Sequence, residues 1–144
     1  MSLTFCPAEV RDAAVIFEQA RELILKYEDR ELLDIPKVLS WMEKKIHSEI
    51  FNYTCVRLNG EKVAYYRLDL SQNPGELDDF YVMPAYQGRG IGTRILEILL
   101  KDLKIPVFLY VFKENLPAVR LYEKAGFVHR EDVSETRCIL QRNS

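Results

Sequence analysis

The chain is poor in the residues that hold metal ions or form disulfides. It has 3 cysteines and 2 histidines among 144 residues. The cysteines are odd in number and lack Cys-x-x-Cys spacing, so the sequence indicates neither a disulfide framework nor a metal-ligand cluster. We interpret Cys6, Cys55 and Cys138 as free buried thiols and expect no metal site.

The sequence also lacks an excess of charge of one sign and a long apolar run. Lys and Arg number 20 against 22 Asp and Glu, which gives a formal net charge of -2. No basic field is therefore available to attract nucleic acid or an anionic membrane. The longest apolar run, around Ile95 to Leu100, is far too short to cross a bilayer, and the first residues lack a basic-then-apolar signal pattern. We expect a soluble, cytoplasmic protein with no nucleic-acid or membrane partner.

What the chain does have is enough apolar material for one core. Hydrophobic residues make up 48% of its 144 residues, and this length is typical of a single domain. No repeat, low-complexity tract or linker interrupts it. We therefore expect one domain over residues 1–144.

The spacing of apolar residues predicts the order strand, two helices, three strands, helix, strand, helix, two strands. Asn59-Gly60 is a strong two-residue hairpin signal. This order indicates an α/β fold with a mixed central β-sheet flanked by helices. The expected elements are a strand at 3–5, helices at 13–27 and 36–50, strands at 53–58, 63–70 and 76–83, a helix at 91–103, a strand at 107–112, a helix at 116–125 and strands at 127–133 and 135–140.

Three glycines, Gly88, Gly90 and Gly92, separate the strand at 76–83 from the helix that follows it. Glycine permits positive φ and lets bare backbone approach a ligand, and a helix N-terminus presents N–H groups and partial positive charge. The segment suits a diphosphate, although an ordinary glycine-rich turn has the same composition. A P-loop and a dinucleotide fingerprint both fit poorly, because Gly-Lys-Ser/Thr is absent and Thr93 stands where a third glycine is needed.

Two motifs, one after the other along the chain, resemble those of a known protein family. The stretch Leu77-x-x-Phe80-x-Val82-x-Pro84-x-x-Gln87-Gly88-Arg89-Gly90-Ile91-Gly92 resembles the coenzyme A signature of the GCN5-related N-acetyltransferases (GNAT). Downstream, Asn115-x-x-Ala118-x-x-Leu121-Tyr122-Glu123-Lys124-x-Gly126-Phe127 resembles the family's second motif. The resemblance implies a GNAT-like fold over nearly the whole chain, although residues before about Phe51 match only in outline.

The resemblance also implies where acetyl-coenzyme A binds. Backbone N–H groups of the glycine segment would hold the diphosphate, and the segment comprises Gln87, Gly88, Arg89, Gly90, Ile91, Gly92 and Thr93. Tyr81 and Val82 would lie beside the pantetheine arm and the thioester, with the Val82 N–H as oxyanion donor. In this family the strand at 76–83 diverges from that at 107–112, and the arm pairs into the gap. Asn115 matches a cofactor contact, although a helix cap is an equal alternative.

For catalysis the resemblance indicates Tyr122 as the general acid, since a phenol with a pKa of about 10 keeps its proton at neutral pH. Packing alone is the alternative for this aromatic side chain. Glu76 leads as general base, ahead of Asp78 and Asp79, because it occupies the place of a catalytic glutamate in some relatives. Ideal alternation would put Glu76, Asp78, Phe80 and Val82 on one strand face, although a solvated turn acid would look the same.

Taken together, the residues predict an acetyl-coenzyme A-dependent N-acetyltransferase that acts by direct attack of a primary amine. The alternative is a non-catalytic acyl-coenzyme A binding or regulatory module. The acceptor, a small molecule or a peptide amine, is not identified by the sequence. The acids Glu28, Asp29, Glu31 and Asp34 could attract a cationic amine, but a solvated polar loop is the better interpretation. A homodimer through the final strands or a sheet edge is a further expectation from the family.

Overall fold

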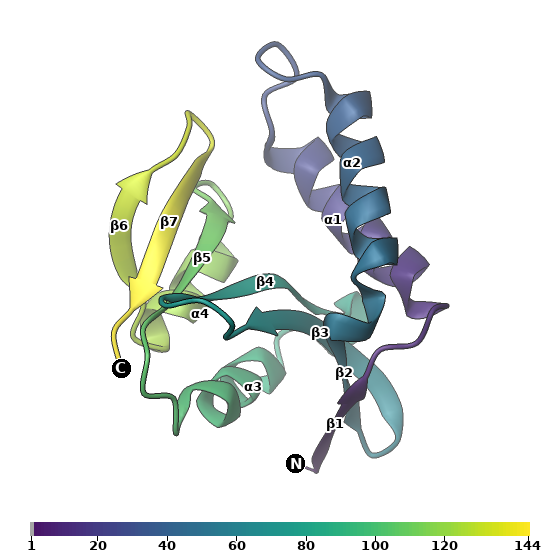
Figure 1. Cartoon of the computed structure of the whole chain (residues 1–144), viewed down its shortest axis with the longest axis vertical. Helices are drawn as coiled ribbons and strands as arrows, with labels where there is room; N and C mark the ends of the chain where they lie inside the picture. Colours follow the sequence, from purple (N-terminus) through teal and green to yellow (C-terminus); the bar gives the residue numbers. More distant parts are fainter. Residues whose placement is uncertain (1) are drawn as a thin grey trace. The chain divides into compact units, whose positions relative to one another are not determined.

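A computed structural model describes residues 2–144 and gives the predicted order of helices and strands (Figure 1). Two short 3-10 helices, η1 at Ile50–Asn52 and η2 at Pro84–Tyr86, are additional. The main elements are β1 (Leu3–Pro7), α1 (Asp12–Tyr27), α2 (Ile35–Ser48), β2 (Tyr53–Leu58), β3 (Glu61–Asp69), β4 (Gly75–Val82), α3 (Ile91–Leu100), β5 (Val107–Phe112), α4 (Leu116–Lys124), β6 (Val128–Asp132) and β7 (Arg137–Arg142).

The seven strands form a mixed sheet in the order β1-β2-β3-β4-β5-β7-β6. The pair β4 and β5 is parallel, as expected for strands joined through a crossover helix, whereas β1–β2, β2–β3, β5–β7 and β6–β7 are antiparallel. This arrangement confirms the predicted α/β fold class. The chain forms two compact units, one of residues 2–67 with Asp79–Tyr81 and one of residues 68–78 with 82–144. The expectation of a single domain stays a prediction.

In the first unit, α1 and α2 pack together beside the β1–β3 strands (Figure 1). Helix α2 begins at Ile35, one residue before the predicted start, because the Asp34 side chain accepts a hydrogen bond from the Lys37 N–H and Pro36 occupies the first turn. It ends at Ser48, two residues before the predicted end. The β2–β3 hairpin turns at Asn59 (φ 51°) and Gly60 (φ 88°), the left-handed conformations that this dipeptide favours. The unit's largest fully buried side chains include Ile16, Ile46, Tyr53, Val56, Val63 and Tyr65.

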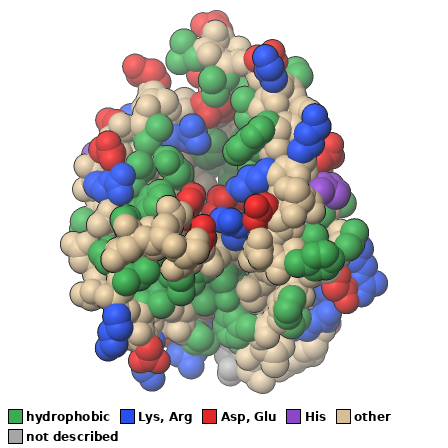
Figure 2. Space-filling model, viewed as in Figure 1, with side chains coloured by type: hydrophobic (Ala, Val, Ile, Leu, Met, Phe, Trp, Pro, Cys, Tyr) green, Lys and Arg blue, Asp and Glu red, His purple; other side chains and the backbone are tan. Residues whose placement is uncertain are grey.

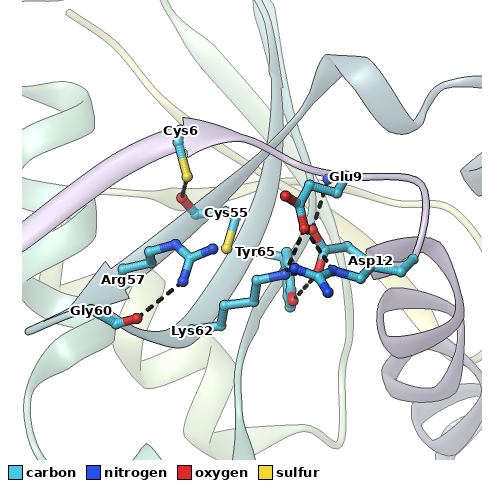
Figure 3. Close-up of polar contacts among 9 residues, drawn as sticks. Cys6, Glu9, Asp12, Cys55, Arg57, Gly60, Lys62 and Tyr65 are labelled. Carbon is cyan, nitrogen blue, oxygen red and sulfur yellow. Dashed lines mark hydrogen bonds and ion pairs between the residues drawn. The ribbon is translucent and has the colours of Figure 1, made fainter.

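One buried carboxylate stands out in this apolar core. Asp12, in the first turn of α1, is 2% exposed. It accepts hydrogen bonds from the Glu9 N–H (2.8 Å), the Lys62 ammonium (2.8 Å) and the Tyr65 hydroxyl (2.7 Å), as Figure 3 shows.

Cys6 and Cys55 lie opposite each other on β1 and β2, and both are free thiols. Cys6 is half-buried, so the expectation that all three cysteines are buried is wrong for this one.

In the second unit, α3 and α4 pack together, and β7 lies between β5 and β6. Its buried apolar side chains are Leu77, Ile91, Ile95, Leu96, Leu100, Val107, Leu109, Val111, Tyr122, Phe127, Cys138, Ile139 and Leu140. Helix α3 ends at Leu100, short of the predicted Leu103. The reason is a tighter turn, in which the Leu103 N–H donates to the Leu100 carbonyl.

Figure 2 shows acidic and basic side chains interspersed over the face it views, in keeping with the nearly balanced composition. Within residues 2–144, none of the helices combines the length and the apolar character needed to span a membrane.

Candidate functional site

The glycine segment forms an open backbone turn that leads into α3. Gly88 (φ 78°) and Gly90 (φ 77°) adopt left-handed conformations that side chains disfavour. A Cβ atom built at either position would meet no heavy atom within 4 Å, so the space beside this backbone is empty of protein. Gly90 is the N-cap of α3, and no side chain caps the helix. Helix α3 thus begins with N–H groups that no side chain caps and with the positive end of its dipole, an arrangement suited to an anion.

Gly92 serves a different purpose, because it lets three elements meet at one point. A Cβ atom on Gly92 would lie 3.2 Å from Leu121 Cδ2 in α4 and 3.5 Å from Val82 Cγ2 at the end of β4. The absence of a side chain thus brings α3 close to both elements. The same contact places the start of α3 beside Leu121, the residue before Tyr122.

Two side chains of the segment have protein partners. Gln87 Nε2 donates a hydrogen bond to the Val82 carbonyl over 2.9 Å, which ties the turn to the end of β4. The Arg89 guanidinium lies over the Tyr86 ring, 5.4 Å from its centroid. These contacts leave the backbone of the turn, rather than the Gln87 side chain, as the feature suited to a diphosphate.

Helix α4 carries the other predicted residues of this unit. Asn115 is its N-cap residue, yet its side chain makes no capping hydrogen bond, so the capping alternative for this side chain is wrong. Tyr122 is 8% exposed and packs edge-on against Phe127, with ring centroids 5.8 Å apart. Gly126 ends the helix at φ 97°, as predicted.

Strand β4 is less regular than ideal alternation predicts. Burial alternates from Gly75 to Leu77 and then stops, and Asp79 has a positive φ of 48°. A left-handed residue breaks the period of two, so the expectation that Glu76, Asp78, Phe80 and Val82 share one face is wrong. The register between β4 and β5 covers two positions, Gly75 with Val107 and Glu76 with Phe108.

The three candidate bases have different surroundings. Glu76 and Asp78 are half-buried. Glu76 precedes Val82 by six positions, roughly 20 Å along an ideal strand at about 3.3 Å per residue. Asp79 lies in the first unit, where Tyr81 donates its hydroxyl to Asp79 Oδ1 over 2.7 Å. The sequence does not predict this contact. It offers a signal only for the kink of the backbone, because aspartate is among the residues that tolerate positive φ.

The acids between α1 and α2 form local turns. Glu28 Oε1 accepts the Asp29 N–H, Asp29 Oδ1 accepts the Glu31 N–H, and Asp34 caps α2. These contacts agree with the interpretation of a polar loop. In the part of the chain that the structure describes, His, Cys, Asp and Glu form no group of three arranged to hold a metal ion.

Comparisons with known proteins agree with this geometry. The profile of the acetyltransferase (GNAT) family matches residues 16–127. The spermine/spermidine N(1)-acetyltransferase of Bacillus subtilis (strain 168) is 36% identical over 56 residues, which cover 35% of this chain and 37% of the relative. The mycothiol acetyltransferase of Corynebacterium glutamicum (strain R) is 35% identical over 80 residues, which cover 51% of this chain and 27% of the relative. The matched segments thus span well under half of these curated relatives.

Solved structures share the fold. The PaiA N-acetyltransferase of Thermoplasma acidophilum, in complex with coenzyme A, superposes with a TM-score of 0.71 at 23% identity over 100% of both chains. An N-acetyltransferase of Staphylococcus aureus Mu50 gives a TM-score of 0.72 at 16% identity, over 96% of this chain and 99% of the other. At such identities the likeness extends to the fold alone.

Proposed function

The chain belongs to the acetyltransferase (GNAT) family, and we propose that it transfers an acetyl group from acetyl-coenzyme A to a primary amine. The observation that carries the proposal is the uncapped N-terminus of α3, which opens beside the bare backbone of Gly88 and Gly90. A diphosphate needs such a cluster of N–H donors and a positive helix end. The meeting of Gly92, Val82 and Leu121 supports the proposal, because it joins the anion cradle to the strand and helix that carry the remaining predicted residues.

The residues present fit the cofactor. The backbone of Gly88–Thr93 would hold the diphosphate, whereas the Gln87 N–H, which was also expected to do so, donates to the Pro84 carbonyl over 3.3 Å. Asn115 offers an amide that no capping contact uses. The backbone of Tyr81 and Val82 would lie along the pantetheine arm, with the Val82 N–H directed at the oxygen on which negative charge develops. Bound there, acetyl-coenzyme A supplies an acetyl thioester that the amine attacks directly.

Tyr122 holds a proton on its Oη and would pass it to the departing thiolate. The edge-on contact with Phe127 fixes the plane of the Tyr122 ring, so the hydroxyl has a defined direction. Glu76 would take the proton of the amine. Its separation from Val82 along β4 is longer than one water molecule can bridge, so the proton would have to pass along a chain of water molecules.

Binding of the cofactor and turnover are tested separately. Titration calorimetry with acetyl-coenzyme A should give a saturable signal, and a thiol-release assay should show coenzyme A forming once an accepted amine is added. The amine panel should begin with spermine and spermidine, because a relative named for them matches 36% of positions over 56 residues. Binding without turnover across the panel would instead favour a non-catalytic acyl-coenzyme A binding module. No binding at all would exclude both functions.

A homodimer stays a prediction. Strand β6 ends the strand order, and all five of its residues are exposed. Light scattering of the purified chain would measure its oligomeric state.

A further inference from the structure

Asp79 has a backbone conformation that is unusual for a residue within a β-strand. Its φ of 48° falls within strand β4, where extended values are expected. Among residues 2–144, the other non-glycine residue with positive φ is Asn59, which occupies a hairpin turn that requires it. A strained residue persists only where its surroundings hold it, so the contacts of Asp79 bear on its role.

Those contacts occupy both carboxylate oxygens. Oδ2 accepts hydrogen bonds from the Tyr53 hydroxyl (2.5 Å) and from the Lys45 ammonium (3.3 Å), and Oδ1 accepts one from the Tyr81 hydroxyl (2.7 Å). The Asp79 side chain is 4% exposed, and the Lys45 side chain 21%. The partners come from α2, from the first residue of β2 and from β4 itself, all within the first unit. Three donors thus hold one carboxylate in place.

A carboxylate with this environment is poorly suited to accept a proton from an amine. A general base must reach the proton that it removes, directly or through one water, with a lone pair available. Asp79 is almost inaccessible, and three donors already point at its oxygens.

We propose that Asp79 is a positioning residue, whose three side-chain hydrogen bonds hold the left-handed kink of β4 and thereby set the path of Phe80, Tyr81 and Val82. The inference rests on the proposed function, in which the backbone of Tyr81 and Val82 lies along the acetyl-bearing arm. An oxyanion donor contributes only when it is held in place before the reaction, and a misplacement of about 1 Å can cost roughly 100-fold in rate. The diphosphate cradle at Gly88–Thr93 includes none of the residues that hold Asp79.

The test separates cofactor binding from turnover. Asp79→Gly accepts a positive φ but removes all three hydrogen bonds, whereas Asp79→Asn keeps the shape and removes the charge. For Asp79→Gly we expect kcat to fall about 10–100-fold, with a smaller rise in the calorimetric Kd of coenzyme A because the diphosphate cradle is untouched. For Asp79→Asn we expect a smaller fall in kcat and a pH profile of unchanged shape. Asp102→Asn, in the exposed turn after α3, is the matched control.

Three results would overturn the inference. If Asp79→Gly is folded by circular dichroism and keeps full kcat, the kink has no role in turnover. If Asp79→Asn abolishes the acidic limb of the kcat/KM profile, Asp79 is the base and not a positioning residue. If the unmodified chain does not bind acetyl-coenzyme A, the proposed function fails and the inference fails with it. Should Asp79→Gly not fold, the double variant Tyr53→Phe, Tyr81→Phe keeps the aspartate and removes two of its three donors, and the same fall in kcat is expected.

Discussion

The Tyr65 hydroxyl donates a hydrogen bond to Asp12 Oδ1 over 2.7 Å, although the two residues lie 53 positions apart in the chain. Lys62 reaches the same oxygen over 2.8 Å, so β3 is joined to the first turn of α1 by two side chains of one strand (Figure 3). Burial opposes ionisation of Asp12, but hydrogen bonds from Lys62, the Glu9 N–H and Tyr65 outweigh it and lower the pKa of the carboxyl. Burial and the Asp12 contact raise the pKa of Tyr65, which keeps the hydroxyl a donor.

Replacing this carboxylate should destabilise the first unit. Asp12→Asn removes the buried partner of Lys62, whose side chain is 24% exposed and still pairs with Glu9. The cost should therefore lie below the about 3–5 kcal/mol that the loss of one member of a fully buried ion pair entails. Urea unfolding at pH 7 would measure the change in the free energy of unfolding. Glu9→Gln is the control, because the Glu9 side chain is 51% exposed and should matter little. An unchanged midpoint for Asp12→Asn would contradict the prediction.

The same variant should alter the pH dependence of stability. The folded pKa of Asp12 is lowered, so the unfolded chain takes up the proton first, near its ordinary pKa of about 3.9. The stability from this group is therefore complete well above pH 4 and is lost as the pH falls through the folded pKa. Unfolding curves of the unmodified chain and of Asp12→Asn should converge as the pH falls from 7 to below about 4. A constant difference over this range would show that Asp12 does not titrate in this way.

Two glycine substitutions distinguish strain from ligand contact. Gly88→Ala and Gly60→Ala both place a Cβ at positive φ in open space, so each should cost a similar 1–2 kcal/mol of stability. Only Gly88→Ala should weaken coenzyme A binding, by about tenfold or more, because its methyl group enters the proposed diphosphate cradle. Calorimetry compares the two, and equal Kd values would argue against the cradle.

Gly92→Val should fail for a packing reason. Its Cβ would lie 3.2 Å from Leu121 Cδ2, and the added branches would push α3 from α4 at a cost of about 1–3 kcal/mol. We expect a lower Tm together with weaker cofactor binding. Normal stability and normal cofactor binding would mean that α3 and α4 can move apart to accommodate the added side chain at little cost in free energy.

Tyr122→Phe retains the ring that packs on Phe127 and removes only the hydroxyl. A general acid contributes about 100-fold or more, so kcat for thiol release should fall by that factor with little change in the Kd of coenzyme A. Tyr110→Phe, at a side chain that is 46% exposed, is the control. A kcat equal to that of the control would assign Tyr122 to packing alone.

The cysteines should react in a fixed order. Burial raises the pKa of the Cys55 thiol to about 11, and burial also raises that of Cys138. Thiolate is the reactive form, so iodoacetamide at pH 8 should modify half-buried Cys6 before either buried thiol. Mass spectrometry of the native protein would follow the adducts, and Cys6→Ser should remove the first one. Earlier labelling of Cys55 would indicate local opening of β2.

Local rules account for most of the fold. Asn59-Gly60 turns a hairpin, Asp34 and Pro36 start α2, and Gly126 ends α4, because each depends on the conformational preference of residues adjacent in the chain. The apolar period continues to Leu103, three residues beyond the end of α3, because the backbone tightens into a turn after Leu100 while the apolar spacing persists. Element ends depend on such backbone hydrogen bonds, which apolar spacing does not report.

By itself, the sequence determined the order of the elements, the α/β class and the glycine turn before α3, since periodicity and glycine conformation are local properties. Only the tertiary structure decided how individual side chains are used. In the folded chain the Gln87 side chain donates to the Val82 carbonyl, and the Asn115 side chain does not cap α4. Asp79 accepts hydrogen bonds from donors in α2, β2 and β4. The physical reason is that each of these three side-chain arrangements depends on groups that only folding brings together. The sequence offered Glu76 as the leading base ahead of Asp78 and Asp79, and only the tertiary structure showed that three donors hold the Asp79 carboxylate.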